Sequence, residues 1–282
     1  MKLREMRECA ANTLDFFIDA MPDVPFTKNG VIIEFAKKSD MAKRAVELCE
    51  MYCPDKILNT SQCHQLNKSI AANALIGREK SAVLVRIDSK LSKNNLRRIL
   101  VHELMHIFCA KLEIDSEHFI DIYGSGTTPE ATPENRIHDG MLVAGYSVWT
   151  EFIAQYYAIK LIDEKPYVFN SIAEYITQLL FEVNGLDLKI SKDSFSMACA
   201  YWFNCTDLDD TIAELKEPNT FIPSEDPHGE ETQNTLCGCI NHIYSQMQNT
   251  KPWKITEEFI IELGIKFCMF RTANSFYIGI IN

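Results

Sequence analysis

Residues 102–106 read His-Glu-Leu-Met-His, an instance of the pattern His-Glu-x-x-His. In an α-helix, residues four apart lie one turn apart on the same face, so both imidazoles can point at a single position. Two imidazole nitrogens on one face are what a zinc ion needs from its first two protein ligands. The spacing therefore predicts a metal site at His102 and His106. Glu103 lies about 100° around the axis from His102, where it can act as a general base without binding the metal.

The metal site requires that residues 95–112 form a helix. Apolar residues recur there at three- and four-residue spacing, and neither Gly nor Pro interrupts the run. Ser92 is the expected N-cap. The alternative is a surface helix with two unremarkable histidines. It is less favoured because apolar residues flank the pair, and partly buried imidazoles need partners.

A catalytic zinc usually takes three protein ligands and leaves one position for water. A third His six residues after the second is excluded, because position 112 is Leu. The remaining donors at workable distances are His118, Asp121, His138 and Glu151. Glu151 is favoured because it lies on a predicted helix, with Ala154 and Ala158 on the same face to allow close approach. The alternative for Glu151 is an exposed helix charge.

The segment Trp149-Thr150-Glu151-Phe152-Ile153-Ala154, following His102-Glu103-x-x-His106, resembles the gluzincin metallopeptidases. In those enzymes a Glu on a second helix completes a two-His site, and Glu151 to Ala154 matches their Glu-x-x-Ala element. Intracellular members of the ImmA/IrrE type, which cleave regulators, are similar in this respect. The resemblance covers the two helices, with a longer spacer than in compact gluzincins. It implies an α+β, zincin-like fold and a zinc-dependent peptidase with ligands His102, His106 and Glu151.

Hydrolysis of a peptide bond also needs a hydrogen-bond donor for the oxyanion. The available donors are Tyr123, His138, Tyr146 and Tyr157. His138 and Tyr146 flank the predicted ligand helix and are favoured as catalytic residues. Their alternatives are ordinary packing and surface roles.

Composition and charge narrow the class of protein. The 282 residues carry 28 basic against 39 acidic side chains, a net charge of -11, which argues against nucleic acid as a partner. No hydrophobic run has the length of a signal peptide or a membrane span. The ten scattered cysteines are therefore expected to be free thiols of a cytoplasmic protein. The expected partner is a peptide or protein substrate.

The sequence divides into three expected parts. Residues 1–112 form an α+β region that ends in the motif helix, with helices at 3–20, 40–52 and 68–76 and strands at 30–35 and 82–87. The edge of the strand at 82–87 is expected to hold an extended peptide. Residues 113–140, rich in Gly, Thr and Pro, form a loop or lid, with a disordered insertion as the alternative.

Residues 141–282 are expected to be mainly helical and to carry the third ligand. The predicted helices span 141–162, 167–183, 195–204, 206–215, 232–248 and 256–263, and local alternation predicts one or two strands within 266–281.

Two other functions compete with the peptidase. One is a zinc-binding scaffold or regulatory protein without catalysis. Glu103 argues against it, because a structural zinc site needs no base and usually fills its fourth position with Cys or His. The other is a hydrolase of non-peptide amides that uses the same site.

Overall fold

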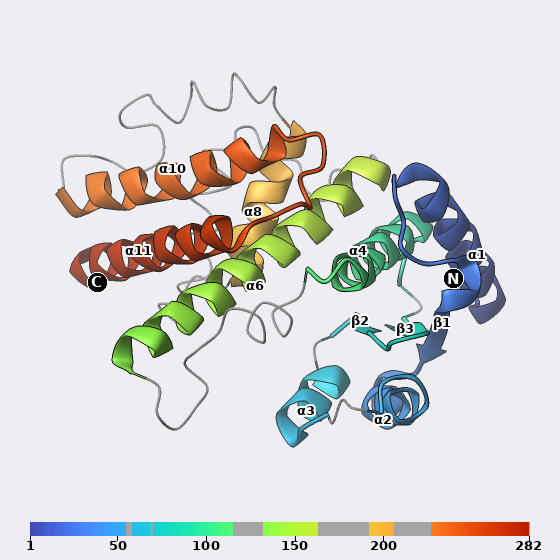
Figure 1. The fold of residues 1–282 in the computed structure, drawn as a ribbon. Helices are drawn as coiled ribbons and strands as arrows, with labels where there is room; N and C mark the ends of the chain where they lie inside the picture. The colour runs from blue at the N-terminus through green and yellow to red at the C-terminus, as the bar shows by residue number, and fades with distance from the viewer. Residues whose placement is uncertain are drawn as a thin grey trace. The chain divides into compact units, whose positions relative to one another are not determined.

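A computed structural model describes residues 1–54, 58–68, 70–88, 90–114, 132–162, 192–205 and 227–281. The chain forms two compact units, one of Met1–Glu113 with Tyr157–Glu164 and the other of Ile114–Tyr156 with Lys165–Asn282. The described residues form helices and one small sheet (Figure 1), so the predicted α+β class is confirmed. The zincin-like arrangement stays a prediction.

The sheet of the first unit has three strands, β1 (Val31–Ala36), β2 (Ala72–Leu75) and β3 (Ser81–Arg86), in the order β1-β3-β2. β1 runs parallel to β3, and β2 runs antiparallel to it. All residues of β3 except the last are buried, as expected for a Val- and Leu-rich strand covered on both faces. Because β3 is paired on both sides, the prediction that its edge holds a peptide is wrong.

Helices cover both faces of this sheet (Figure 1). On one face lie α1 (Leu3–Ala20) and α4 (Lys93–Lys111), which pack against each other. On the other lie α2 (Met41–Tyr52) and α3 (Thr60–Lys68). A core cluster joins the second face to its helices, and its members include Met41, Leu48, Leu66, Leu75 and Leu84. The sheet therefore supports α4 from one side while α2 and α3 close the other.

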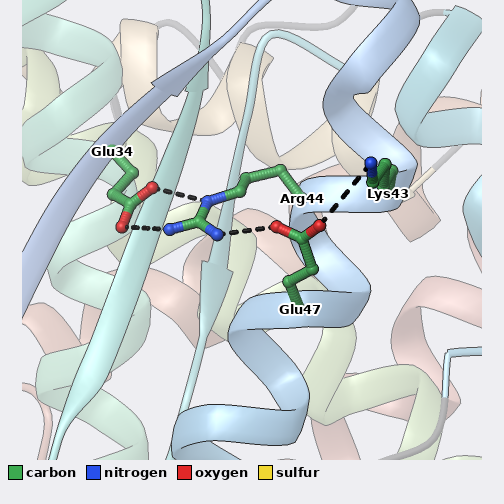
Figure 2. A network of polar contacts seen from close by, with 4 residues as sticks. All are labelled: Glu34, Lys43, Arg44 and Glu47. Atoms are coloured by element: carbon green, nitrogen blue, oxygen red, sulfur yellow. Dashed lines mark hydrogen bonds and ion pairs between the residues drawn. The ribbon is translucent and has the colours of Figure 1, made fainter.

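An arginine fixes α2 to β1 (Figure 2). Arg44 donates from Nε and Nη2 to the two carboxylate oxygens of Glu34, both at 2.7 Å, and from Nη1 to Glu47 at 2.7 Å. The Nζ atom of Lys43 lies 4.0 Å from the other carboxylate oxygen of Glu47. The hydrogen bonds to Glu34 and Glu47 raise the pKa of Arg44 above its usual value, so its charge is permanent.

The described part of the second unit is helical. It contains most of α6 (Pro133–Ile162), with α8 (Lys192–Cys205), α10 (Pro227–Met247) and α11 (Glu257–Ile281). Trp149 is fully buried, and its ring lies 5.0 Å from that of Phe259. Ser196 of α8 donates a hydrogen bond to the carbonyl of Val148 at 2.9 Å. Among the described residues, none of the helices combines the length and hydropathy needed to cross a bilayer.

Three sequence predictions about elements are wrong. Residues 266–281 belong to α11 and not to strands, and the buried positions Ile260, Leu263, Phe267 and Phe270 follow a helical period up to residue 270. Residues 133–140, predicted as loop, are the first turns of α6, which begins at Pro133, a residue favoured at that position. Residues 68–76 are not a helix, because α3 ends at Lys68 and β2 follows.

The other predictions match an observed helix or strand in full or in part, or lie outside the described residues. The helix predicted at 3–20 is confirmed, and those at 40–52 and 95–112 and both strands differ from the observed elements by one or two residues. The helices predicted at 167–183 and 206–215 lie outside the described residues, as do positions 115–131 of the predicted lid.

Candidate metal centre

The N-terminus of α4 is held by the predicted cap. The side chain of Ser92 accepts a hydrogen bond of 3.1 Å from the backbone nitrogen of Asn95. This bond satisfies one of the free N–H groups of the first turn. The prediction of Ser92 as N-cap is confirmed.

One side of α4 is packed and the other carries the motif. Leu96, Leu100, Leu104 and Ile107 are completely buried. His102, Glu103 and His106 are half-buried on the remaining side. The buried stripe prevents rotation of α4 about its axis, so the orientation of the motif is fixed by packing.

The C-terminal end of α4 is tied to the connection between β2 and β3. The ammonium of Lys111 donates to the carbonyl of Gly77 at 2.6 Å and also to that of Arg78. A Cβ at Gly77 would overlap the carbonyl oxygens of Tyr52 and Lys80, so only glycine allows the backbone of this connection to lie so close to them. Both ends of the motif helix are therefore anchored within the first unit.

The two imidazoles of the motif converge. The Nε2 atoms of His102 and His106 lie 3.1 Å apart, and the rings meet edge to face with centroids 4.7 Å apart. Two nitrogens bound to one tetrahedral zinc at about 2.0–2.1 Å lie roughly 3.3 Å from each other. The separation also suits a hydrogen bond between one protonated and one unprotonated ring nitrogen. The pair is thus close to the spacing of a shared metal ion.

The pKa of His102 is lowered well below its usual value. Burial is the main cause, followed by the positive charges of His106 and Arg98. His102 is therefore neutral at pH 7, which is the form of imidazole that binds metal ions. Both its lowered pKa and its position beside His106 therefore favour His102 as a metal ligand.

Glu151 is near the pair. One potential ligand atom from each of His102, His106 and Glu151 lies within 4.8 Å of the other two, and all three side chains are half-buried. No other group of three His, Cys, Asp or Glu side chains meets this criterion among the described residues. Two imidazoles and a carboxylate are a donor set of catalytic zinc sites, although other divalent metals also accept imidazole ligands.

The structure places the two predicted oxyanion donors in other contacts. His138 has its Nε2 atom 3.1 Å from Glu257, and it precedes Glu151 by thirteen residues, about 20 Å along α6. The hydroxyl of Tyr146 donates to the carbonyl of Ile114, and Tyr146 lies about 140° around α6 from Glu151. His138 does not belong to the group that includes the histidine pair. His118, Asp121 and Tyr123 lie outside the described residues.

Arg98 is the residue near this centre that sequence reasoning missed. It lies four residues before His102, and its charge contributes to the lowered pKa of that histidine. The same four-residue spacing that identified the histidine pair could have identified Arg98.

Comparison of the chain with protein-family models, with curated proteins and with solved structures found no match.

Proposed function

We propose that this chain is a zinc-dependent metallopeptidase with His102, His106 and Glu151 as the metal ligands. The observation that carries the proposal is the convergence of two imidazole nitrogens, 3.1 Å apart, near the Glu151 carboxylate. The presence of Glu103 next to the first histidine favours a catalytic site over a structural one, because a structural site has no use for a base.

The proposed chemistry assigns a separate role to each side chain. His102, His106 and Glu151 would hold the zinc, which when bound activates a water and polarises the scissile carbonyl. Glu103 takes a proton from this water as its oxygen bonds to the carbonyl carbon. Glu103 then delivers the proton to the amide nitrogen as the carbon–nitrogen bond breaks. The products are a carboxylic acid and an amine, and the acid then loses its second water-derived proton at neutral pH.

The outer edge of β2 is the proposed docking strand for an extended peptide. The hydrogen bond from Arg86 N to Ala71 O, 2.8 Å, sets the pairing phase with β3. In an antiparallel ladder of this phase, Asn73 and Leu75 pair with β3, whereas Ala72 and Ala74 direct their backbone groups to the other side. In the described part of the chain no strand pairs with that side. Because β2 packs against α4, a peptide paired there would run beside the motif helix.

Cleavage of peptide pools tests the proposal. Zinc-loaded wild type is compared with Glu103→Gln and with the control Glu8→Gln, which removes a carboxylate from the exposed side of α1. We expect Glu103→Gln to bind zinc normally and to lose at least about 100-fold in rate, the usual contribution of a general base. Glu8→Gln should cleave like wild type.

Other outcomes would favour the rival functions. Wild type that binds zinc and cleaves no peptide pool would refute the peptidase and favour the scaffold. Cleavage confined to non-peptide amides, with the same loss in Glu103→Gln, would favour the amidohydrolase. Equal cleavage by wild type and Glu103→Gln would contradict the role of Glu103.

A further inference from the structure

Arg98 shares one face of α4 with the histidine pair. Arg98, His102 and His106 follow one another at four-residue intervals, so their side chains leave the helix in one row. The Arg98 side chain is half-buried, and its Nε atom is shielded from solvent. This Nε has no hydrogen-bond partner among the residues that the structure describes. A donor of the guanidinium is therefore buried and unused beside the candidate metal centre.

Two other arginines of the first unit have partners that the structure shows. Arg44 is paired with Glu34 and Glu47, and the guanidinium of the adjacent Arg97 lies 5.5 Å over the ring of Phe16. The chain also carries more acidic than basic residues, 39 against 28. A shielded donor left without an acceptor costs free energy, and a ligand that supplies the missing acceptor removes this cost.

We propose that Arg98 is a substrate-binding residue that receives a carboxylate of the peptide. The inference rests on the proposed peptidase function and specifies its substrate class. A guanidinium matches a carboxylate through two parallel hydrogen bonds, which makes arginine the preferred side chain for this group.

The spacing along α4 limits where the carboxylate lies in the substrate. Arg98 precedes His102 by about 6 Å along the helix axis, and an extended peptide advances about 3.3 Å per residue. The recognised carboxylate therefore lies within about two residues of the scissile bond. It belongs either to the peptide's C-terminus, which makes the protein a carboxypeptidase, or to an Asp or Glu side chain, which makes it an endopeptidase with an acidic preference.

Binding measurements separate these sources without requiring turnover. Three pools of randomised pentapeptides, fluorescently labelled at the N-terminus, are titrated against the zinc-loaded Glu103→Gln protein by anisotropy. One pool has a free C-terminal carboxylate and no acidic residue, one has a C-terminal amide and no acidic residue, and one has a C-terminal amide and one Asp or Glu. Each titration is repeated with Arg98→Gln, Arg98→Lys and the matched control Arg97→Gln.

We expect one carboxylate-bearing pool to bind at least about tenfold more tightly than the neutral pool, as a charge-assisted hydrogen bond should give. Arg98→Gln should abolish this difference, Arg98→Lys should retain part of it, and Arg97→Gln should leave it unchanged. A tighter first pool identifies the C-terminal carboxylate as the ligand, and a tighter third pool identifies an acidic side chain.

Equal affinity for the three pools, absence of binding by all of them, or an equal effect of Arg97→Gln and Arg98→Gln would overturn the proposal. A different result would show that the protein is not a peptidase. In that case wild type cleaves nothing, whatever the carboxylate preference of the binding step. If wild type cleaves peptides but the pools bind equally, the peptidase stands and the role of Arg98 does not.

Discussion

Replacing Gly by Ala within a helix normally stabilises a protein, but at the crossing of α6 and α11 in the second unit we expect this substitution to be destabilising. Gly145 of α6 lies against the backbone of α11. A Cβ added there would overlap the carbonyl oxygen of Ile260 and lie 2.8 Å from the nitrogen of Gly264. These are backbone atoms of a packed helix, so they cannot rotate away as a flexible side chain would. Gly145→Ala must therefore move the two helices apart.

The magnitude follows from comparison with Gly140 on the same helix, where an added Cβ meets nothing within 4 Å. Replacement of a helical Gly by Ala stabilises by about 1 kcal/mol when the site is open. Overpacking in a dense interior costs about 1–3 kcal/mol. Because the helix-propensity gain is common to both substitutions, it cancels in their difference. The free energy of unfolding should be lower for Gly145→Ala than for Gly140→Ala by about 3 kcal/mol, since backbone atoms place the cost at the upper end.

Urea denaturation followed by tryptophan fluorescence measures this difference. All three tryptophans, Trp149, Trp202 and Trp253, belong to the second unit, so the signal reports on the unit that contains the crossing. Gly140→Ala should shift the midpoint to higher urea and Gly145→Ala to lower urea, with similar slopes. Equal midpoints for the two variants would refute the close crossing inferred at Gly145.

Three further predictions concern the first unit. Ser92→Ala should lower the free energy of unfolding by about 1 kcal/mol, because α4 loses its N-cap, and a thermal melt followed by circular dichroism that matches wild type would contradict this. Arg44→Lys should lower the free energy of unfolding by less than about 1 kcal/mol, because the ion pair with Glu34 is partly exposed, and this loss should disappear in high salt. A loss several times larger in urea titration would show that the contact is stronger than inferred. Burial raises the pKa of the Cys109 thiol to about 12, whereas an unfolded thiol ionises near about 8.5. The unfolded state therefore releases this proton first as pH rises, and stability from Cys109 is present below pH 8.5 and lost toward pH 12 at about 1.4 kcal/mol per pH unit. Cys109→Ala should flatten the decline of stability between pH 9 and 11, and an unchanged slope would argue against a buried thiol there.

Elements with a local signal were predictable from the sequence. α1 and α4 show apolar residues at helical spacing, and their buried positions are those residues. The cap at Ser92 was visible for the same reason, because the capping bond joins residues three apart. The histidine pair depends on a single helical turn, so its convergence follows from the sequence alone.

Features that depend on distant segments were not predictable. The central position of β3 results from pairing with β1 and β2, and no local pattern encodes which strands become neighbours. β2 is short and contains Asn and two Ala, which have low strand propensity, so its pairing with β3 decides its conformation. The first turns of α6 are polar and mostly exposed, which left no apolar period to reveal them.

The early start of α6 also separates His138 from Glu151. Proximity in the sequence made His138 a reasonable partner of Glu151. Once both residues lie on one continuous helix, the rise per residue holds them about 20 Å apart. The position of Arg98 beside His102, by contrast, follows from their four-residue spacing on one helix and could have been predicted from the sequence.

Zinc binding by variants of the three proposed ligands is the most direct test of the central claim. Affinity is measured by competition with a chromophoric chelator for wild type, His106→Ala, Glu151→Gln and the control His64→Ala, an exposed histidine of α3. We expect one zinc per chain in wild type and His64→Ala. In His106→Ala and Glu151→Gln we expect affinity to fall at least about tenfold, a loss of about 1.4 kcal/mol or more. Absence of zinc binding by wild type, or equal affinity in all four proteins, would contradict the metal centre.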